Sequence, residues 1–179
     1  SDVSRIEMTR GPDGTLYGNS STGGAINLVS HKPQHDELFG AMSFAAGAYS
    51  QQEARAMVNV PVNNELAFRV SASHRQRDGY TENKAIENYE LDDVDNETIK
   101  AQISWQPSDD INVLFQHQVF SSDTHGPALK GGFDTISDDP RVVYHDTPEF
   151  YRLYTQLSSF HFDWTLPGSA LSVILSKQR

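Results

Sequence analysis

Apolar and polar residues alternate through most of the chain after residue 38, and this alternation limits its fold more than any other feature. Within 54–62, the alternate positions Ala54, Ala56, Val58, Val60 and Val62 are all apolar. The same pattern recurs at 65–75, 98–106, 111–119, 160–166 and 171–178, and less regularly at 38–49. Because successive side chains of a β-strand point to opposite faces of a sheet, the pattern predicts seven strands, most simply paired as an antiparallel meander.

The connections between these predicted strands alternate in length. Those at 63–64, 107–110 and 167–169 are tight, whereas a short connection at 49–52 and two long ones at 78–96 and 121–149 fall between them. Alternate connections of an antiparallel meander lie at the same end of the sheet, so all the tight turns share one end. Tight turns at one end and longer loops at the other are typical of outer-membrane β-barrels.

Two tryptophans agree with a membrane-embedded sheet without requiring one. Trp105 and Trp164 both lie on the predicted apolar face, shortly before a tight turn, where indole rings would meet a membrane boundary. A soluble β-sandwich binding module, with both tryptophans in its core, fits the same alternation. His117 on the apolar face also counts against contact with lipid. From the alternation alone, both interpretations stay open.

Composition excludes several functions. The chain has 24 acidic residues against 14 lysines and arginines, a formal charge of −10, whereas nucleic-acid binding needs clustered positive charge. It contains no cysteine, which excludes disulfides, thiol catalysis and cysteine-based metal sites. No run approaches the roughly 18 apolar residues of a transmembrane helix. A β-rich enzyme would need a convergent polar site, and no Ser/His/Asp or paired-carboxylate arrangement stands out.

Residues 8–33 form a glycine-dense run that reads MTRGPDGTLYGNSSTGGAINLVSHKP. It lacks the Gly-Lys-Ser/Thr ending of a nucleotide P-loop, and its glycine spacing does not match the dinucleotide fingerprint. Glycine permits positive φ angles and close approach of one backbone to another. The run therefore predicts two buried strands, containing Ile6 and Met8 in one and residues 25–29 in the other, joined by a sharp bend.

The order and spacing of this run resemble the end of the plug domain of TonB-dependent outer-membrane receptors. That pattern reads Arg-Gly-Pro, Tyr-Gly, Gly-Gly-x-Ile-Asn and Lys-Pro. The matching residues here are Arg10, Gly11, Pro12, Tyr17, Gly18, Gly23, Gly24, Ile26, Asn27, Lys32 and Pro33. The resemblance implies that residues 1–36 are the C-terminal part of a plug and that residues 37–179 are the N-terminal strands of a barrel. The expected fold class is all-β, a partial antiparallel transmembrane β-barrel of about seven strands.

The resemblance also implies a function. A plugged transporter barrel has about 22 strands, so the chain is expected to be a fragment of a longer receptor. Such receptors work in the bacterial outer membrane, surrounded by lipid, and most often take up a ferric siderophore bound by plug apices and external loops. TonB, with its inner-membrane energising complex, is the expected partner, through a segment outside these residues. No cofactor and no enzymatic step are expected, and cobalamin or an oligosaccharide stays open as the ligand.

Site residues follow from the same resemblance. Arg10 resembles the plug arginine that forms an ionic latch with glutamates of later barrel strands, a role that suits a guanidinium because it can bind two carboxylate oxygens. A hydrated surface arginine is the alternative. The other residues of the motif are expected to be structural. On the long loops, the candidates for ligand binding are Tyr80, His125 and Phe133, with solvated loop residues as the alternative.

No metal site is predicted. His31 and His35 have the spacing of helical neighbours, but Pro33 between them argues against a helix. The acidic run at 90–97 places Asp93, Asp95 and Glu97 at alternating positions. It lacks the glycine that a calcium-binding EF-hand loop requires at its sixth position. A solvated, charged external loop is the simpler interpretation of this run.

Overall fold

The chain forms two compact units, Ser1–Lys32 and Pro33–Arg179, in a computed structural model that describes residues 2–11, 23–131 and 136–179. In the first unit, β1 (Val3–Arg10) and β2 (Gly24–Ser30) form an antiparallel hairpin that pairs Arg10 with Gly24. Gly24 has a φ of +123°, and a Cβ atom there would lie 2.1 Å from the carbonyl oxygen of Thr9. Only glycine fits this position, so the prediction of close backbone approach is confirmed at Gly24.

The remaining residues of the glycine-rich run divide into two groups. Gly11, Gly23, Ile26 and Asn27 are among the described residues, and Gly11 has a φ of +91°. Pro12, Tyr17 and Gly18 lie outside the described residues.

The hairpin exposes an apolar face. Ile6 pairs with Leu28 and Met8 pairs with Ile26, and each of these four side chains is at least 60% exposed. The prediction that both strands are buried is therefore wrong for the described part of the chain. A two-stranded hairpin has no second layer of its own that could cover either face.

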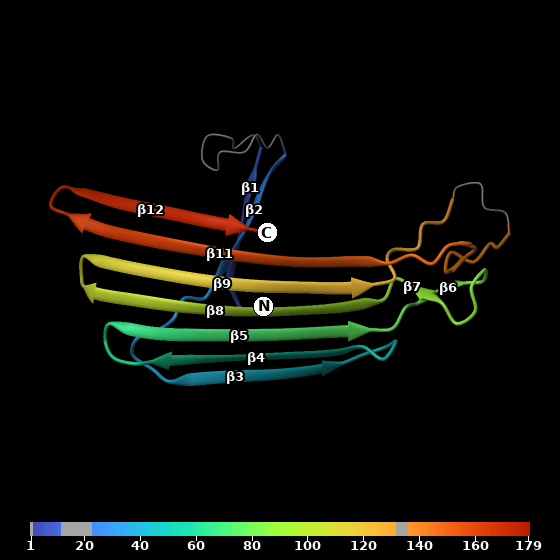
Figure 1. Ribbon diagram of the computed structural model, residues 1–179, viewed down its shortest axis with the longest axis horizontal. Helices are drawn as coiled ribbons and strands as arrows, with labels where there is room; N and C mark the ends of the chain where they lie inside the picture. The colour runs from blue at the N-terminus through green and yellow to red at the C-terminus, as the bar shows by residue number, and fades with distance from the viewer. Residues whose placement is uncertain (1, 12–22, 132–135) are drawn as a thin grey trace. The chain divides into compact units, whose positions relative to one another are not determined.

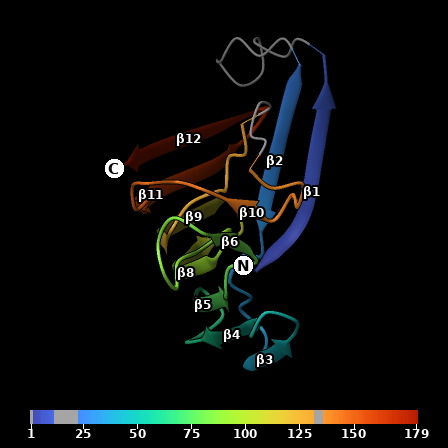
Figure 2. The same ribbon diagram turned by 90° about the vertical axis from the view of Figure 1, so that its right-hand side faces the viewer.

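The second unit is built on a seven-stranded antiparallel sheet (Figure 1). Its order is β12-β11-β9-β8-β5-β4-β3, so the main strands follow one another as a meander, as predicted. Figure 2 shows the same succession from the end of the strands. The strands are β3 (Phe39–Ala46), β4 (Gln52–Pro61), β5 (Leu66–Arg77), β8 (Val94–Ser108), β9 (Ile111–Thr124), β11 (Tyr151–Leu166) and β12 (Ser169–Gln178). The described residues include no helix long and apolar enough to cross a membrane.

Several strands are longer than the alternation predicts. β11 begins at Tyr151 rather than at residue 160, and β9 continues to Thr124 rather than ending at residue 119. These extensions carry polar residues on both faces, as in Ser121, Ser122 and Asp123, so they show no apolar period. The ladder of hydrogen bonds continues through them because a strand needs only backbone partners to extend.

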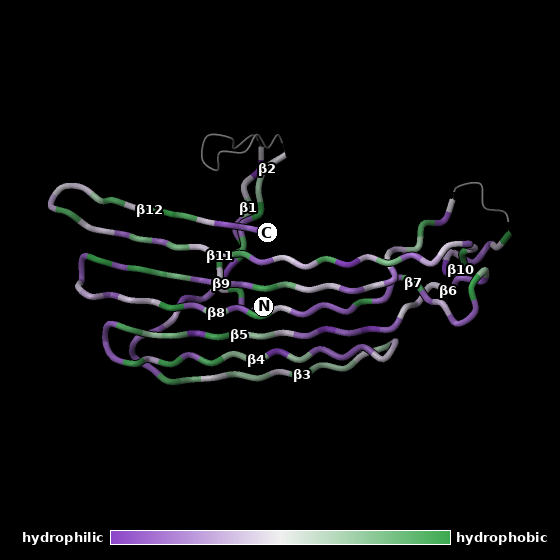
Figure 3. The backbone as a smooth tube through the Cα atoms, in the orientation of Figure 1, coloured by the Kyte–Doolittle hydropathy of each residue, from purple (hydrophilic) through white to green (hydrophobic). Residues whose placement is uncertain are grey.

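The sheet buries mainly polar side chains and exposes apolar ones, the reverse of the sheet of a water-soluble protein. The buried side chains of its strands are mostly polar: Asn59, Arg69, Ser71, Lys100, Gln102, Ser104, Ser122 and Ser159. The opposite face exposes large apolar side chains, among them Val58, Val70, Ile99, Ile103, Phe115, Phe160 and Leu175. Figure 3 shows the alternation along the strands. A β-sandwich would bury the apolar face against a second sheet. Since this face is uncovered in the part of the chain that the structure describes, the β-sandwich interpretation is wrong.

The two tryptophans and His117 lie on the exposed apolar face. Trp105 is 48% exposed and Trp164 is 39% exposed, and both stand near the end of the sheet that carries the tight turns. The Nδ1 atom of His117 lies 2.8 Å from the hydroxyl oxygen of Ser158 on the neighbouring strand. A hydrogen-bonded partner removes most of the cost of placing an imidazole on an apolar surface, so His117 does not contradict contact with lipid.

Candidate functional site

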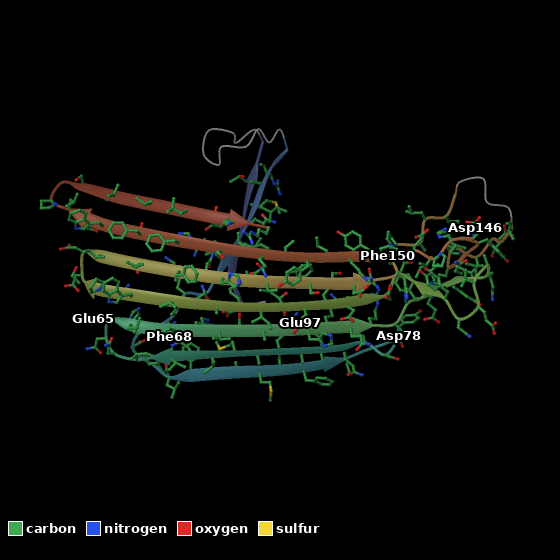
Figure 4. The ribbon with its side chains drawn as sticks, viewed as in Figure 1. Glu65, Phe68, Asp78, Glu97, Asp146 and Phe150 are labelled. Atoms are coloured by element: carbon green, nitrogen blue, oxygen red, sulfur yellow. The ribbon has the colours of Figure 1, made fainter. Side chains whose placement is uncertain are left out.

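The longer connections of the sheet lie at one end, as predicted. They comprise residues 47–51, the first long loop at 78–93 and the second long loop at 125–150. In Figure 4, Asp78 and Phe150 stand at this end of the sheet, and Glu65 stands at the opposite end, where the turns are tight. We call the end of the sheet that carries the longer connections the loop end.

The two long loops form a small sheet of their own. β6 (Thr81–Asn83) pairs antiparallel with β7 (Glu90–Leu91) and parallel with β10 (Val142–Val143). Leu91 is 0% exposed and Val143 is 1% exposed, so the loops contain a core. Sequence reasoning treated these segments as irregular loops, because strands of two or three residues are too short to show a period.

Asn83 joins the two long loops. Its Nδ2 atom donates to the carbonyl oxygen of His145 at 2.8 Å, and its Oδ1 atom accepts from the backbone N–H of His145 at 3.0 Å and of Ala85 at 3.2 Å. The side chain is 1% exposed. A buried carboxamide with both ends satisfied holds the loops in one register, since any shift would leave polar atoms without partners.

Asp92, a residue of the first long loop, also connects the two long loops. Its carboxylate accepts from the hydroxyl of Thr81 at 2.6 Å and from the backbone N–H of Ala128 at 3.1 Å, and its own N–H donates to the carbonyl oxygen of Gly126 at 3.0 Å. The interpretation of the acidic run at 90–97 as a solvated loop is wrong for most of the run, because Glu90–Leu91 form β7, residues 94–97 belong to β8 and Asp92 is partly buried. The run showed no sign of this role, because its partners lie in a distant part of the sequence.

A cavity of about 650 Å³ opens at the loop end, lined by three tyrosines, Tyr49, Tyr80 and Tyr89. The ring centroids of Tyr49 and Tyr80 are 5.9 Å apart and tilted by 55°. The guanidinium carbon of Arg77 lies 4.9 Å from the centroid of Tyr80, and Arg141 donates to the hydroxyl of Tyr49 at 3.1 Å. These contacts place each of the two rings against the other and against an arginine.

A second cavity, of about 410 Å³, is lined by several acidic residues together with Arg77 and His125. The backbone N–H of His125 donates to Asp93 Oδ1 at 2.8 Å, and its ring Nδ1 lies 3.3 Å from Asp93 Oδ2. The His125 ring also contacts Tyr89, with centroids 4.7 Å apart. Tyr89 thus connects the two cavities, since it lines the first and contacts a residue of the second.

The predicted ligand-binding residues have different outcomes. Tyr80 and His125 lie at the loop end and line cavities there. Phe133 lies outside the described residues. Tyr49 and Tyr89 line the first cavity as well but were not among the predicted residues, although Tyr49 lies on the neighbouring short connection and Tyr89 on the same long loop as Tyr80.

The remaining predicted positions do not join these cavities. Arg10, the predicted latch residue, is exposed at the end of β1, opposite Gly24. His35, one of the two histidines considered for a metal site, lies with its Nε2 atom 2.9 Å from the hydroxyl oxygen of Ser104. Within the ranges that the structure describes, no three or more histidine, aspartate or glutamate side chains are grouped to hold a metal ion.

Comparison with known proteins gives a consistent family. The metal-pseudopaline receptor of Pseudomonas aeruginosa is 29% identical over 119 residues, which cover 65% of this chain and 16% of that protein. The ferric enterobactin receptor of the same species is 25% identical over 158 residues, covering 77% of this chain and 21% of that protein. The crystal structure of the ferric yersiniabactin uptake receptor of Yersinia pestis matches 99% of this chain and 28% of its own length, with a TM-score of 0.87 and 22% identity.

No model of a known protein family matches the chain. The chain spans about a fifth or less of the length of the two curated relatives. The relatives and the solved structure confirm the resemblance that the glycine-rich run indicated, and they confirm the fold as part of a plugged β-barrel.

Proposed function

Because the chain is related to the TonB-dependent siderophore receptors, we propose that it is part of a receptor that takes up a ferric siderophore across the bacterial outer membrane. Its exposed apolar face contacts lipid, and its polar face lines the interior of the barrel. The hairpin β1–β2 belongs to the plug. The ligand enters from the side of the loop end and leaves towards the periplasm, where the tight turns lie.

The gathering of aromatic side chains around cavities at the loop end is the observation that carries this proposal. Tyr49, Tyr80 and Tyr89 come from two different connections, yet they line one cavity. Aromatic rings offer flat apolar surfaces on which the organic part of a chelate can stack, and neighbouring polar groups can orient it. A chelate binds through its organic shell, so this site needs no protein ligand to the iron.

His125 belongs to the same proposed site, and Phe133 stays a candidate on the sequence alone. His125 stands against Tyr89, and its ring presents a hydrogen-bonding group at the second cavity. In the protein at its full encoded length, we expect His125→Ala and Phe133→Ala to weaken binding of the ferric chelate. Unchanged affinity in both variants would remove these two residues from the site.

Arg10 is proposed to form the latch between plug and barrel. It is the last residue of β1, and it begins the Arg-Gly-Pro motif. A guanidinium can hold two carboxylate oxygens in fixed geometry and can release them when the plug rearranges. TonB and its energising complex are the proposed source of that rearrangement. A full-length structure with Arg10 far from every barrel carboxylate would exclude the latch.

Uptake measurements test the proposal directly. Cells that carry the gene are compared with a deletion strain for accumulation of radioactive iron supplied as hydroxamate, catecholate or mixed chelates. We expect the deletion to abolish uptake of one chelate class, and we expect a proton uncoupler to abolish it in the parent strain. Uptake of labelled cobalamin or of an oligosaccharide in place of every iron chelate would overturn the siderophore assignment and leave a receptor of the same family.

A further inference from the structure

Residues 33–37, which we call the strap, connect the hairpin to the first strand of the sheet and are bound to the sheet by Asn59. The backbone N–H of Gln34 donates to Asn59 Oδ1 at 2.9 Å. The Nδ2 atom of Asn59 donates to the carbonyl oxygen of Gln34 at 2.9 Å and to that of Glu37 at 2.8 Å. Both donors of the carboxamide and its oxygen are therefore engaged by the strap.

Asn59 is well placed to act as an anchor. It lies on β4, on the polar face of the sheet, and it is 0% exposed. If the strap left the sheet, three backbone groups and the carboxamide would lose their partners together. Because buried polar groups without partners are costly, these hydrogen bonds favour the strap in its docked position.

A second contact holds the strap at another strand. The Nε2 atom of His35 lies 2.9 Å from the hydroxyl oxygen of Ser104 on β8. Pro33, at the start of the strap, is buried. The boundary between the two compact units lies between Lys32 and Pro33, which places the whole strap in the unit of the sheet.

We infer that Asn59 is a positioning residue that keeps the strap docked on the sheet during transport, so that any rearrangement of residues 1–32 ends at the Lys32–Pro33 bond. The inference rests on the proposed function, because it concerns the transport cycle. In this inference, the docked strap is the fixed point to which residues 1–32 are attached. The strap then serves as a permanent tether, and the moving part of the plug lies entirely before it in sequence.

A cross-link between strap and sheet tests this inference. Residues 1–179 contain no cysteine, so His35→Cys and Ser104→Cys introduce the only two thiols within these residues. Because the geometry of a direct disulfide is restrictive, the thiols are joined with a short, reducible bis-methanethiosulfonate reagent in the full-length receptor in cells. The two single variants, treated with the same reagent, are the controls.

The inference predicts that the cross-linked double variant takes up the ferric chelate at the same rate as the untreated double variant. Loss of uptake on cross-linking, restored by a reducing agent, would overturn it, because the strap would then have to leave the sheet. If the wild-type protein takes up no chelate at all, the proposed function fails instead, and this outcome is distinguishable because it precedes any cross-link.

Hydrogen exchange tests the anchor without any transport measurement. In the purified full-length protein, we expect the Gln34 amide to be protected in the wild type and to lose that protection in Asn59→Ala. Asn64→Ala, a change of the same kind in an exposed turn, is the matched control and should leave the protection unchanged. Equal protection of Gln34 in the wild type and in Asn59→Ala would show that Asn59 does not hold the strap, and would overturn the inference.

Discussion

Asn83 and His145 are 62 residues apart in the sequence, yet the side-chain carboxamide of one exchanges two hydrogen bonds with the backbone of the other. This pair holds β6 beside the second long loop, and with it the cavities at the loop end. Asn83 also lines the tyrosine-lined cavity, so the geometry of the proposed ligand site depends on this contact.

Replacement of Asn83 should loosen the two long loops, because its side chain is buried between them. Asn83→Ala leaves the carbonyl oxygen and the N–H of His145 without these partners, which we expect to cost about 1–3 kcal/mol of local stability. Limited proteolysis of the full-length protein should then cut both long loops faster. Asn64→Ala is the control, and equal cleavage rates in the two variants would contradict the assigned role of Asn83.

Tyr80 should contribute to chelate binding mainly through its ring. Tyr80→Phe keeps the ring that packs on Tyr49 and Arg77, whereas Tyr80→Ala removes it. An aromatic contact of this kind is worth about 0.5–1.5 kcal/mol, so we expect Tyr80→Ala to weaken binding several-fold and Tyr80→Phe to weaken it less. Equilibrium binding of a labelled ferric chelate to outer membranes measures both.

Tyr144 supplies the matched control for Tyr80. It is an exposed tyrosine of the second long loop and is absent from the lining of the two cavities. Tyr144→Ala should leave the affinity unchanged. If Tyr80→Ala binds the chelate as tightly as Tyr144→Ala, the tyrosine-lined cavity is not the ligand site.

The effects of replacing His117 and Ser158 on stability should not be additive, because the two side chains are hydrogen-bonded on the apolar face. Ser158→Ala leaves the His117 imidazole without its partner, at a cost of about 1 kcal/mol, whereas the double variant His117→Leu, Ser158→Ala removes both polar groups. We expect the single variant to be less stable than the wild type and the double variant to recover that loss. Urea unfolding of the full-length protein in lipid vesicles measures the difference, and equal destabilisation in both variants would exclude the coupling.

Glu7 should titrate below the ordinary range of a glutamate. The Arg5 side chain, which donates at 2.6 Å, and then the Asn27 side chain, which donates at 3.0 Å, lower the pKa of the Glu7 carboxyl. Because the lowered pKa means that the folded hairpin favours the carboxylate, this stabilisation is present above the ordinary carboxyl pKa. It is lost as the pH falls through the lowered pKa.

Carboxyl-carbon NMR of the full-length protein measures the pKa of Glu7. We expect Arg5→Gln to raise this pKa more than Asn27→Ala does, since the contact with Arg5 has the larger effect. An unchanged pKa in both variants would show that neither side chain acts on the carboxylate. A raised pKa in Asn27→Ala would also give Asn27, a residue of the glycine-rich motif, a physical role inside the hairpin.

Much of the fold was predictable because it depends on short-range pattern. The alternation from Ala54 to Val62 requires only that neighbouring side chains point to opposite faces, and the structure confirms a strand there. Gly24 was likewise predictable, because its backbone approaches Thr9 too closely for a side chain. The burial of Ile6 and Met8 was predicted wrongly, since burial requires a covering layer that a local pattern does not specify.

The amino-acid sequence by itself determined the meander, its two unlike faces and the end of the sheet at which the long loops lie. These properties follow from local periodicity and from chain direction. Only the tertiary structure decided that Asn83 binds His145, that Asp92 joins two loops and that Asn59 holds the strap. Each of those contacts joins residues distant in sequence, and the carboxamides and the carboxylate involved would look the same in an ordinary solvated loop. Their partners exist only after the strands have aligned.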